Sequence, residues 1–408
     1  VQLRTASLVL AAVGLGFWLL LSLFDPNWRP STSIWPTLVL PIGALALATA
    51  ASAWPRLGLE YVAWAVVLVG LYLLLVRILA TRTARARIGG LAAIIALVVG
   101  VLYLLTVLQI WIEWWGLVEG FAVPPLRPLY GGLSLGGPGG VMMVQVLTTA
   151  TAIAALGVTG RRRQALAAAL VALAVPVVVI TASRTGWGAL AGAIVITSGL
   201  WVVLAARSGS LRARIAERWA QRGVRVTIGA AAVGALVTAV VAAPVVLDRL
   251  LNSGAGGRGQ YFTVAWRMFT DEPLLGHGPG TWAVRRVAHT EPGELDHYIP
   301  HAHDVYLQTL AELGVVGALI GLVALVPVAW LIARALGSVP AEHRRWAWCA
   351  VFATSFMGLV ALFDFKMNVP TALLLGALPI AWLDGASDRG IGLGSLSDSA
   401  ALWIGRVA

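Results

Sequence analysis

Charged residues and cysteine are scarce in this sequence. Only 12% of the 408 residues are charged, 59% are hydrophobic and the mean hydropathy is +0.86, which is far from the composition of soluble proteins. Lys366 is the single lysine, so the net charge of +11 comes almost entirely from arginine. The single cysteine, Cys349, excludes an internal disulfide. These scarcities predict an integral membrane protein, in which a basic excess marks the cytoplasmic face and not a nucleic-acid partner.

Eleven apolar runs, some of them short, have the composition of membrane-spanning helices. The first run lacks a small-residue cleavage site behind it, so we predict that it spans the membrane and is not a signal peptide. The fold class is therefore predicted to be an all-α polytopic membrane protein with about eleven transmembrane helices, in a range of ten to twelve. The runs lie at residues 8–24, 37–53, 61–80, 88–111, 139–158, 165–182, 187–206, 227–247, 304–333, 346–363 and 370–383.

Four of the connections between these runs together hold fifteen arginines, and the positive-inside rule places them in the cytoplasm. The alternate connections then face outward. The arginine-rich connections are 81–87, 161–164, 207–225 and 334–345, and the outer ones are 112–138, 183–186 and 248–303. Four parts follow from this arrangement: N-terminal membrane helices at 1–111, central membrane helices at 112–247, an extracytoplasmic loop domain at 248–303 and C-terminal membrane helices at 304–408.

The outer loop 248–303 concentrates the ionisable residues, which is unusual for a mere connector. Its segment YFTVAWRMF, Tyr261 to Phe269, has the period of an amphipathic helix. We therefore expect the loop to be ordered and to contain short helices. It holds five of the six histidines and five arginines, namely His277, His289, His297, His301, His303, Arg249, Arg258, Arg267, Arg285 and Arg286.

Three motifs in the second half of the chain carry a family resemblance. His303 and the residue after it precede a nine-residue spacer and the sequence GVVG at 314–317. The other two are RGQYFTVAWRMFTDEPLLGHGPGTW at 258–282 and TASRTGWGAL at 181–190. They resemble the histidine–spacer–GxxG signature, the arginine-led loop helix with its PLLGxG turn, and the SR motif of the O-antigen ligase family. The sequence departs from the family at Asp304, where Asn, Ser or Gln is usual.

The resemblance, which extends from Ile112 to the C-terminus, implies a glycosyltransferase-C-like fold in a bacterial inner or plasma membrane. Members of the family move a glycan from a polyprenyl diphosphate carrier to an acceptor hydroxyl at the periplasmic or exterior face, with no cofactor and no obligatory metal. The implied partners are this donor, a lipid, glycan or protein acceptor, and membrane lipids. The acceptor distinguishes a ligase from a glycan polymerase or a protein O-oligosaccharyltransferase, and nothing in the chain names it.

Such a transfer needs groups that neutralise the leaving diphosphate and a base for the attacking hydroxyl. Arginine binds phosphate oxygens in pairs and keeps its charge, and histidine titrates near neutral pH. We therefore assign Arg184 and Arg258 to the diphosphate and His303 to the base. Arg184 is also compatible with a contact to lipid headgroups. His303 is also compatible with a capping or interfacial role. Direct displacement inverts the anomeric carbon, so no second carboxylate is required. The expected supporting residues are His301, Asp304, Glu312, Arg267 and Ser183.

Asp304, Gln308 and Glu312 recur at four-residue spacing and line one stripe of an apolar helix, which is expected to face protein or water. Asp304 is also a candidate N-cap. Glu312 is expected to pair within the helix bundle or to orient a histidine or an arginine. We predict no metal site, because HAHD with Asp296 and His297 matches no zinc spacing.

Two other function classes stay open. In a transporter or channel, ionisable groups would be spread through the membrane span, whereas here they gather at one border, which favours the transferase. A structural or signalling protein that binds a partner through its outer loop is distinguished from the transferase only by the motifs.

Overall fold

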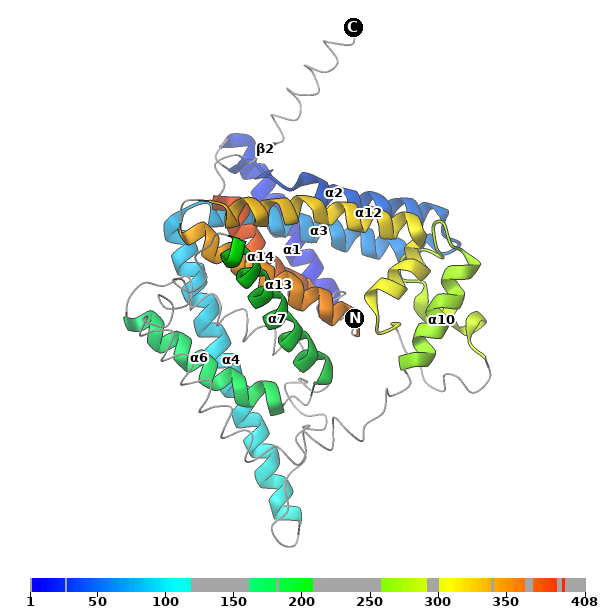
Figure 1. The fold of residues 1–408 in the computed structure, drawn as a ribbon. Coiled ribbons are helices and arrows are strands. Elements are labelled where there is room, and N and C mark those ends of the chain that lie inside the picture. The colour runs from blue at the N-terminus through cyan, green and yellow to red at the C-terminus, as the bar shows by residue number, and fades with distance from the viewer. Residues whose placement is uncertain are drawn as a thin grey trace. The chain divides into compact units, whose positions relative to one another are not determined.

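The computed structural model of the chain describes residues 2–25, 28–118, 161–180, 183–207, 258–291, 301–338, 341–363, 370–386 and 391–392. Apart from the short strands β1 (Ser31–Thr32) and β2 (Ile391–Gly392), these residues form helices and their connections (Figure 1). The helices are α1 (Gln2–Phe24), α2 (Trp35–Ala51), α3 (Pro55–Leu79), α4 (Arg82–Leu117), α6 (Arg161–Ile180), α7 (Arg184–Arg207), α10 (Arg258–Asp271), α11 (Trp282–Arg285), the 3-10 helix η2 (Arg286–His289), α12 (Val305–Leu336), α13 (Ala341–Ala361) and α14 (Pro370–Ala386).

The helical class predicted from the sequence is confirmed for the described residues. Every predicted apolar run that falls among them is helical, and the runs at 139–158 and 227–247 lie outside them. The total of about eleven membrane spans and the glycosyltransferase-C-like arrangement stay predictions. Among the described residues, four helices are long and apolar enough to cross a membrane, at Pro55–Leu79, Ala93–Leu117, Thr185–Arg207 and Val305–Leu336.

The predicted connections are too long, because several helices extend beyond their predicted apolar runs. Residues 112–117 continue α4, 161–164 begin α6 and 184–186 begin α7. Hydropathy marks only the part of a helix that lies in apolar surroundings. Arginine and tryptophan are tolerated in helices and prefer the interface, so they extend a helix beyond its apolar run.

The described residues form two compact units. The first consists of those in Val1–Arg85, Gly257–Ala347 and Ala377–Ala408, and the second of those in Ala86–Gly256 and Trp348–Gly376. The first unit therefore contains α10 and the start of α12, while the second contains α7.

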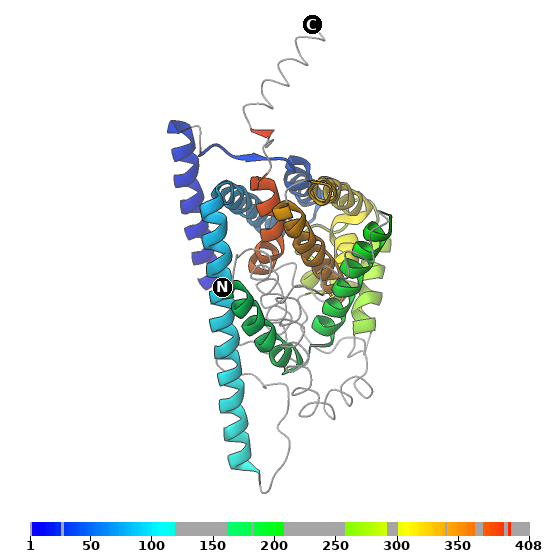
Figure 2. The same cartoon turned by 60° about the vertical axis from the view of Figure 1, so that its left-hand side comes forward.

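In the first unit α2 packs against both α3 and α12, and α1 packs against α3 (Figures 1 and 2). Thr37 of α2 donates its hydroxyl proton to the Ala324 carbonyl of α12 at 2.6 Å, so this hydroxyl is paired between apolar helices. Helix α10 packs against α12 as well. The α2–α12 layer thus supports the loop residues that follow α10.

A buried carboxylate fixes the entry to α2. Asp384 of α14 is 2% exposed and accepts hydrogen bonds from the Thr32 hydroxyl, the Ser33 amide at 2.8 Å, the Ser33 hydroxyl at 2.6 Å and the Tyr72 hydroxyl at 3.2 Å. Beside it β1 and β2 pair antiparallel, with Thr32 opposite Ile391. A buried carboxylate is tolerated when several donors replace its water, so this cluster is a structural anchor.

In the second unit small residues allow close helix contact. Helices α4 and α6 share one buried apolar cluster, and α7 and α13 share another. At Gly192 of α7 an added Cβ would lie 2.5 Å from the Leu359 side chain. Small residues at helix contacts are typical of membrane bundles, where packing supplies much of the stability.

Candidate functional site

Helix α12 is interrupted at Gly314, which has φ 62° and ψ −170°, a conformation open essentially to glycine alone. Two backbone amides after the break find their acceptors in the loop. The Val315 N–H donates to the Pro273 carbonyl at 2.9 Å, and the Val316 N–H to the Leu274 carbonyl at 3.2 Å. The loop therefore satisfies the donors that an interrupted helix leaves open.

The PLLGHG turn, residues 273–278, also donates a backbone hydrogen bond to α12. The Gly278 N–H donates to the Glu312 carbonyl at 2.8 Å. A Cβ added at Gly276, where φ is 65°, would lie 2.4 Å from the Glu312 carbonyl carbon. Two of the three sequence motifs thus interlock through their backbones, and their glycines permit this approach.

The Glu312 carboxylate, in a residue 6% exposed, binds backbone amides of the loop. Its Oε2 accepts from the Gly280 N–H at 3.1 Å, and its Oε1 accepts from the Trp282 N–H at 2.9 Å and the Gln308 side-chain amide at 3.2 Å. These donors replace water around a buried carboxyl group. The prediction that the polar stripe of this helix faces protein or water is confirmed, and the partners of Glu312 are backbone amides and Gln308.

Gln308 connects this carboxylate to the segment before α12. Its Nε2 donates to Glu312, and its Oε1 accepts from the Ala302 N–H at 3.2 Å. Ala302 is fully buried between His301 and His303. The Glu312–Gln308 pair therefore holds the backbone next to the candidate base.

His303 adopts a left-handed backbone conformation, with φ 59°, which is uncommon for a residue other than glycine. Its ring stacks on that of Tyr261 in α10, with ring centroids 5.6 Å apart and a 28° angle between the planes. Tyr261 packs on the buried cluster that contains Met268, Trp282 and Ala302. Strained backbone that is held by its surroundings is characteristic of functional sites.

Asp304 is the N-cap of α12, as one interpretation of the sequence predicted. Its backbone is extended (φ −142°, ψ 115°), and its Oδ1 accepts from the Leu307 N–H at 2.9 Å. Burial raises the pKa of the Asp304 carboxyl, and the backbone amides of Leu307 and Tyr306 oppose that shift. Asn and Ser also cap helices, so aspartate preserves the capping role of a position where the family usually has a neutral residue.

Arg258 is the first residue of α10, one helical turn before Tyr261. Residues three apart share a helix face, so the backbone of Arg258 begins the face that carries the ring stacked on His303. The structure thus brings the start of the second motif and the histidine of the third to one place.

Arg184 is the first residue of α7 and lies in the other unit. Ser183 precedes it and accepts the Gly186 N–H on its side-chain oxygen at 3.1 Å, as an N-cap does. The N-terminus of a helix favours anions. The convergence of Arg184 with Arg258 and His303 stays a prediction.

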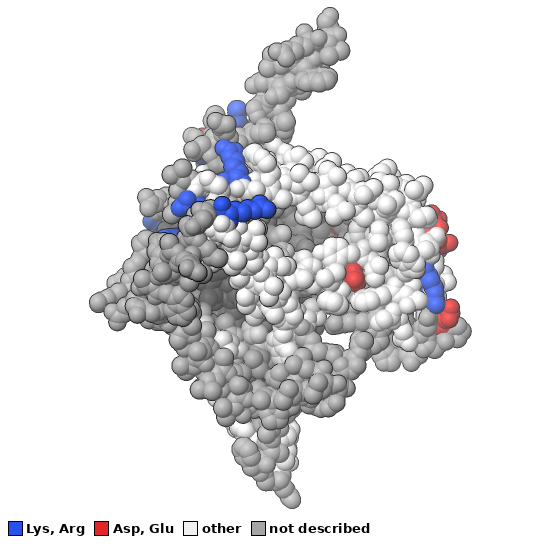
Figure 3. All heavy atoms as spheres, in the orientation of Figure 1, with Lys and Arg blue, Asp and Glu red and all other residues white. Residues whose placement is uncertain are grey.

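Arg267, expected to support the site, holds the end of the loop. Its guanidinium donates to the His289 carbonyl at 3.2 Å and pairs with Glu291 at 2.9 Å. Acidic and basic side chains lie together on the surface at the α10 end of the view in Figure 3. His301, the other expected supporting residue here, is half-buried.

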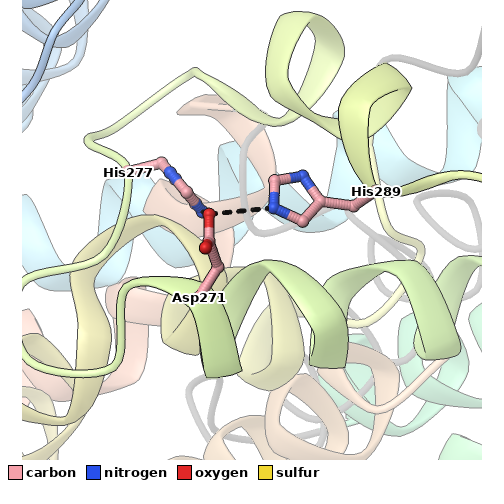
Figure 4. Close-up of side chains that lie close together, drawn as sticks. All are labelled: Asp271, His277 and His289. Atoms are coloured by element: carbon pink, nitrogen blue, oxygen red, sulfur yellow. Dashed lines mark hydrogen bonds and ion pairs between the residues drawn. The ribbon is translucent and has the colours of Figure 1, made fainter.

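A group that the sequence interpretation missed lies at the far end of α10. Asp271, His277 and His289 place a carboxylate oxygen and two ring nitrogens within 4.8 Å of one another (Figure 4). The available signal was the gathering of histidines in this loop around an aspartate at a helix end. Their spacing of six and twelve residues matches no common metal motif, so only the folded turn brings them together.

The apolar helices and the interlocked loop define a class: a helical membrane protein with a histidine site at the start of an interrupted helix. The model of the O-antigen ligase family matches residues 167–322. This match confirms the resemblance to the family over residues 167–322. The match supports a membrane glycosyltransferase function and implies a lipid-linked glycan and an acceptor as substrates. No curated protein matches the chain.

Proposed function

We propose that the protein transfers a glycan from a polyprenyl diphosphate carrier to an acceptor hydroxyl on the extracytoplasmic side of a bacterial inner or plasma membrane, as members of the O-antigen ligase family do. The family match over residues 167–322 carries this proposal, because it contains Arg184, Arg258 and His303. The position of Arg334 in α12 supports this orientation of the protein in the membrane. Arg334 lies over the Trp330 ring, at 5.4 Å from its centroid, near the helix end remote from His303, and arginine is favoured on the cytoplasmic side.

The reaction is a single displacement at the anomeric carbon. The acceptor oxygen forms the new glycosidic bond, the bond to the diphosphate oxygen breaks, and polyprenyl diphosphate leaves with the electron pair. His303 accepts the proton of the acceptor hydroxyl. One displacement inverts the anomeric configuration, and the step requires no metal.

The contacts around His303 support its role as the base. The ring of Tyr261 fixes the imidazole, the Asp304 cap fixes the following helix, and Gln308 with Glu312 holds the preceding backbone. A base fixed in this way loses little entropy when the acceptor binds. Glu312 and Gln308 are therefore positioning residues, and His303 is the catalytic residue.

The two arginines serve the leaving group. Arg258, one turn from the stacked ring of Tyr261, is suited to bind the diphosphate beside the base, and Arg184 adds the N-terminus of α7. Their charges stabilise the developing negative charge of polyprenyl diphosphate in the transition state.

The decisive experiment is transfer in proteoliposomes from a purified polyprenyl diphosphate glycan, with the intact protein compared with His303→Asn. Asparagine tolerates the left-handed backbone of this position but is no base, so transfer should fall by about 10²-fold or more. Arg258→Gln should also abolish transfer. Arg344→Gln removes an exposed arginine in α13 and is the matched control, which should transfer normally.

The acceptor that becomes labelled decides the subclass. A panel of lipid, glycan and protein acceptors separates a ligase from a glycan polymerase and from a protein O-oligosaccharyltransferase. Transfer that His303→Asn and Arg258→Gln leave unchanged would refute the roles proposed for these two residues. No transfer to any acceptor would refute the proposed function and favour a transporter or a partner-binding protein. Transfer should also continue in EDTA, and a complete loss that a divalent ion restores would contradict the metal-free step.

A further inference from the structure

The three side chains at the C-terminal end of α10 converge from three different segments (Figure 4). Asp271 ends α10, His277 lies in the PLLGHG turn and His289 ends η2. The Asp271 Oδ2 lies 3.1 Å from the His289 Nε2 and 3.7 Å from the His277 Nε2. The two rings are tilted at 60° to each other, with centroids 5.2 Å apart.

These separations suit a small divalent cation. A tetrahedral zinc ion has ligands at about 2.0–2.1 Å, which places the ligand atoms about 3.3 Å from one another. The two measured separations lie on either side of that value, and all three ligand atoms lie within 4.8 Å. Two imidazoles and one carboxylate are also the donors that zinc and related transition-metal ions accept in proteins.

A hydrogen bond at the Nδ1 of His289 leaves the lone pair of its Nε2 facing the Asp271 carboxylate. The His289 Nδ1 lies 3.0 Å from the Arg285 carbonyl oxygen, and a carbonyl can only accept, so Nδ1 carries a proton. In the neutral ring Nε2 is then an acceptor that faces a carboxylate oxygen at 3.1 Å. Two acceptors at this distance require a proton or a cation between them. A backbone carbonyl behind a ligating histidine is the usual arrangement in metal sites.

His277 is the weaker of the two imidazole ligands. Its side chain is 3% exposed, and burial, with the Arg285 charge, lowers the pKa of the ring, which favours the neutral form that binds metals. Its Nε2 now donates to the Met268 carbonyl at 3.0 Å, and its Nδ1 lies 3.4 Å from the Arg285 Nε. To bind a cation, the ring must move its proton to Nδ1, and the long contact with Arg285 must open.

We propose that Asp271, His277 and His289 form a binding site for one divalent transition-metal ion of the zinc type. The Asp271 side chain is 52% exposed, which leaves a fourth position open to water. The site is structural, because it joins the end of α10, the PLLGHG turn and η2. It is separate from His303, because the ten helical steps from Tyr261, which stacks on His303, to Asp271 span about 15 Å.

Cobalt binding to the metal-free full-length protein in detergent tests this proposal. The protein should carry a tag without histidine, because a polyhistidine tag would bind the probe. We expect one equivalent of Co²⁺ with visible absorption bands of tetrahedral cobalt, displacement of Co²⁺ by Zn²⁺, and a higher unfolding temperature with Zn²⁺. Transfer activity at low temperature should not require the ion.

Four variants distinguish this site from other histidines. Asp271→Asn and His289→Gln should abolish the cobalt bands, and His277→Gln should weaken binding by at least about tenfold. Arg285→Gln should tighten binding, because it removes a repelling charge and frees the His277 Nδ1. His343→Gln, in α13, is the matched control and should bind as the intact protein does. The absence of cobalt bands, or bands that survive both Asp271→Asn and His289→Gln, would overturn the proposal and leave His289 as a hydrogen-bond partner of Asp271 alone.

Discussion

Helix α12 contains two segments of opposite character that meet at Gly314. The first, residues 305–313, carries Gln308 and Glu312 and makes its polar contacts with the loop. The second, residues 315–336, has Arg334 as its one ionisable residue and exposes large apolar side chains such as Leu322 and Val326. The same helix therefore combines the polar contacts of the candidate site with an apolar segment, and it is long and apolar enough to cross a membrane. The break at Gly314 lets the loop bind where the two segments meet, because the amides after the break donate hydrogen bonds to loop carbonyls.

The largest predicted effect comes from replacing the glycine at the break. Gly314→Ala places a Cβ 2.2 Å from the Leu274 carbonyl oxygen at a φ of 62°, so we expect the free energy of unfolding to fall by about 3 kcal/mol or more. Thermal unfolding in detergent measures this. Gly321→Ala is the matched control in the apolar segment, where a Cβ meets nothing within 4 Å. It should stabilise the protein by about 0.5–1 kcal/mol. Equal effects of the two changes would show that the break does not matter.

The next largest effect tests the polar segment. Glu312→Ala leaves the Gly280 and Trp282 amides buried without their acceptor, which should cost about 2 kcal/mol or more. It should also slow transfer, because Gln308 loses its partner and the backbone beside His303 loosens. Glu312→Gln keeps one acceptor oxygen and should retain more of both properties. If both variants unfold like the intact protein but transfer slowly, Glu312 acts on the substrate and not through the loop.

The sequence predicted the local features of this region and not its long-range contacts. The period of Tyr261 to Phe269 predicted α10, and the position of Asp304 before an apolar run predicted the N-cap, because both depend on neighbouring residues. The interlock of Gly276 with Glu312 joins segments more than thirty residues apart and depends on backbone conformation, which hydropathy does not encode. The Asp271–His277–His289 group depends on the same turn. The proposed roles of Arg184, Arg258 and His303 came from motif resemblance, and transfer assays are their test.

A smaller predicted effect distinguishes the backbone strain at His303 from its proposed catalytic role. His303→Gly should raise the free energy of unfolding by up to about 1 kcal/mol, because glycine adopts the left-handed conformation without strain, even though the stacking on Tyr261 is lost. Transfer should be abolished, since the base is gone. A variant that is clearly less stable than the intact protein would show that the ring stacking outweighs the backbone strain, and retained transfer would exclude His303 as the base.

The smallest predicted effect concerns pH and again distinguishes the loop, which contains Asp271 and His277, from the apolar segment. Burial, with the nearby Arg285 charge, lowers the pKa of His277 in the folded protein. Just below the ordinary histidine pKa of about 6.5, the unfolded chain therefore binds more protons than the folded one, and stability falls as the pH decreases toward the folded value. The hydrogen bond from His289 lowers the pKa of Asp271, so its contribution is lost in the same direction at more acidic pH, reduced by solvent screening. Hydrogen exchange of the 273–281 amides in EDTA should report this fall. His277→Gln should flatten it near neutral pH, whereas an unchanged slope would assign the titration to another group.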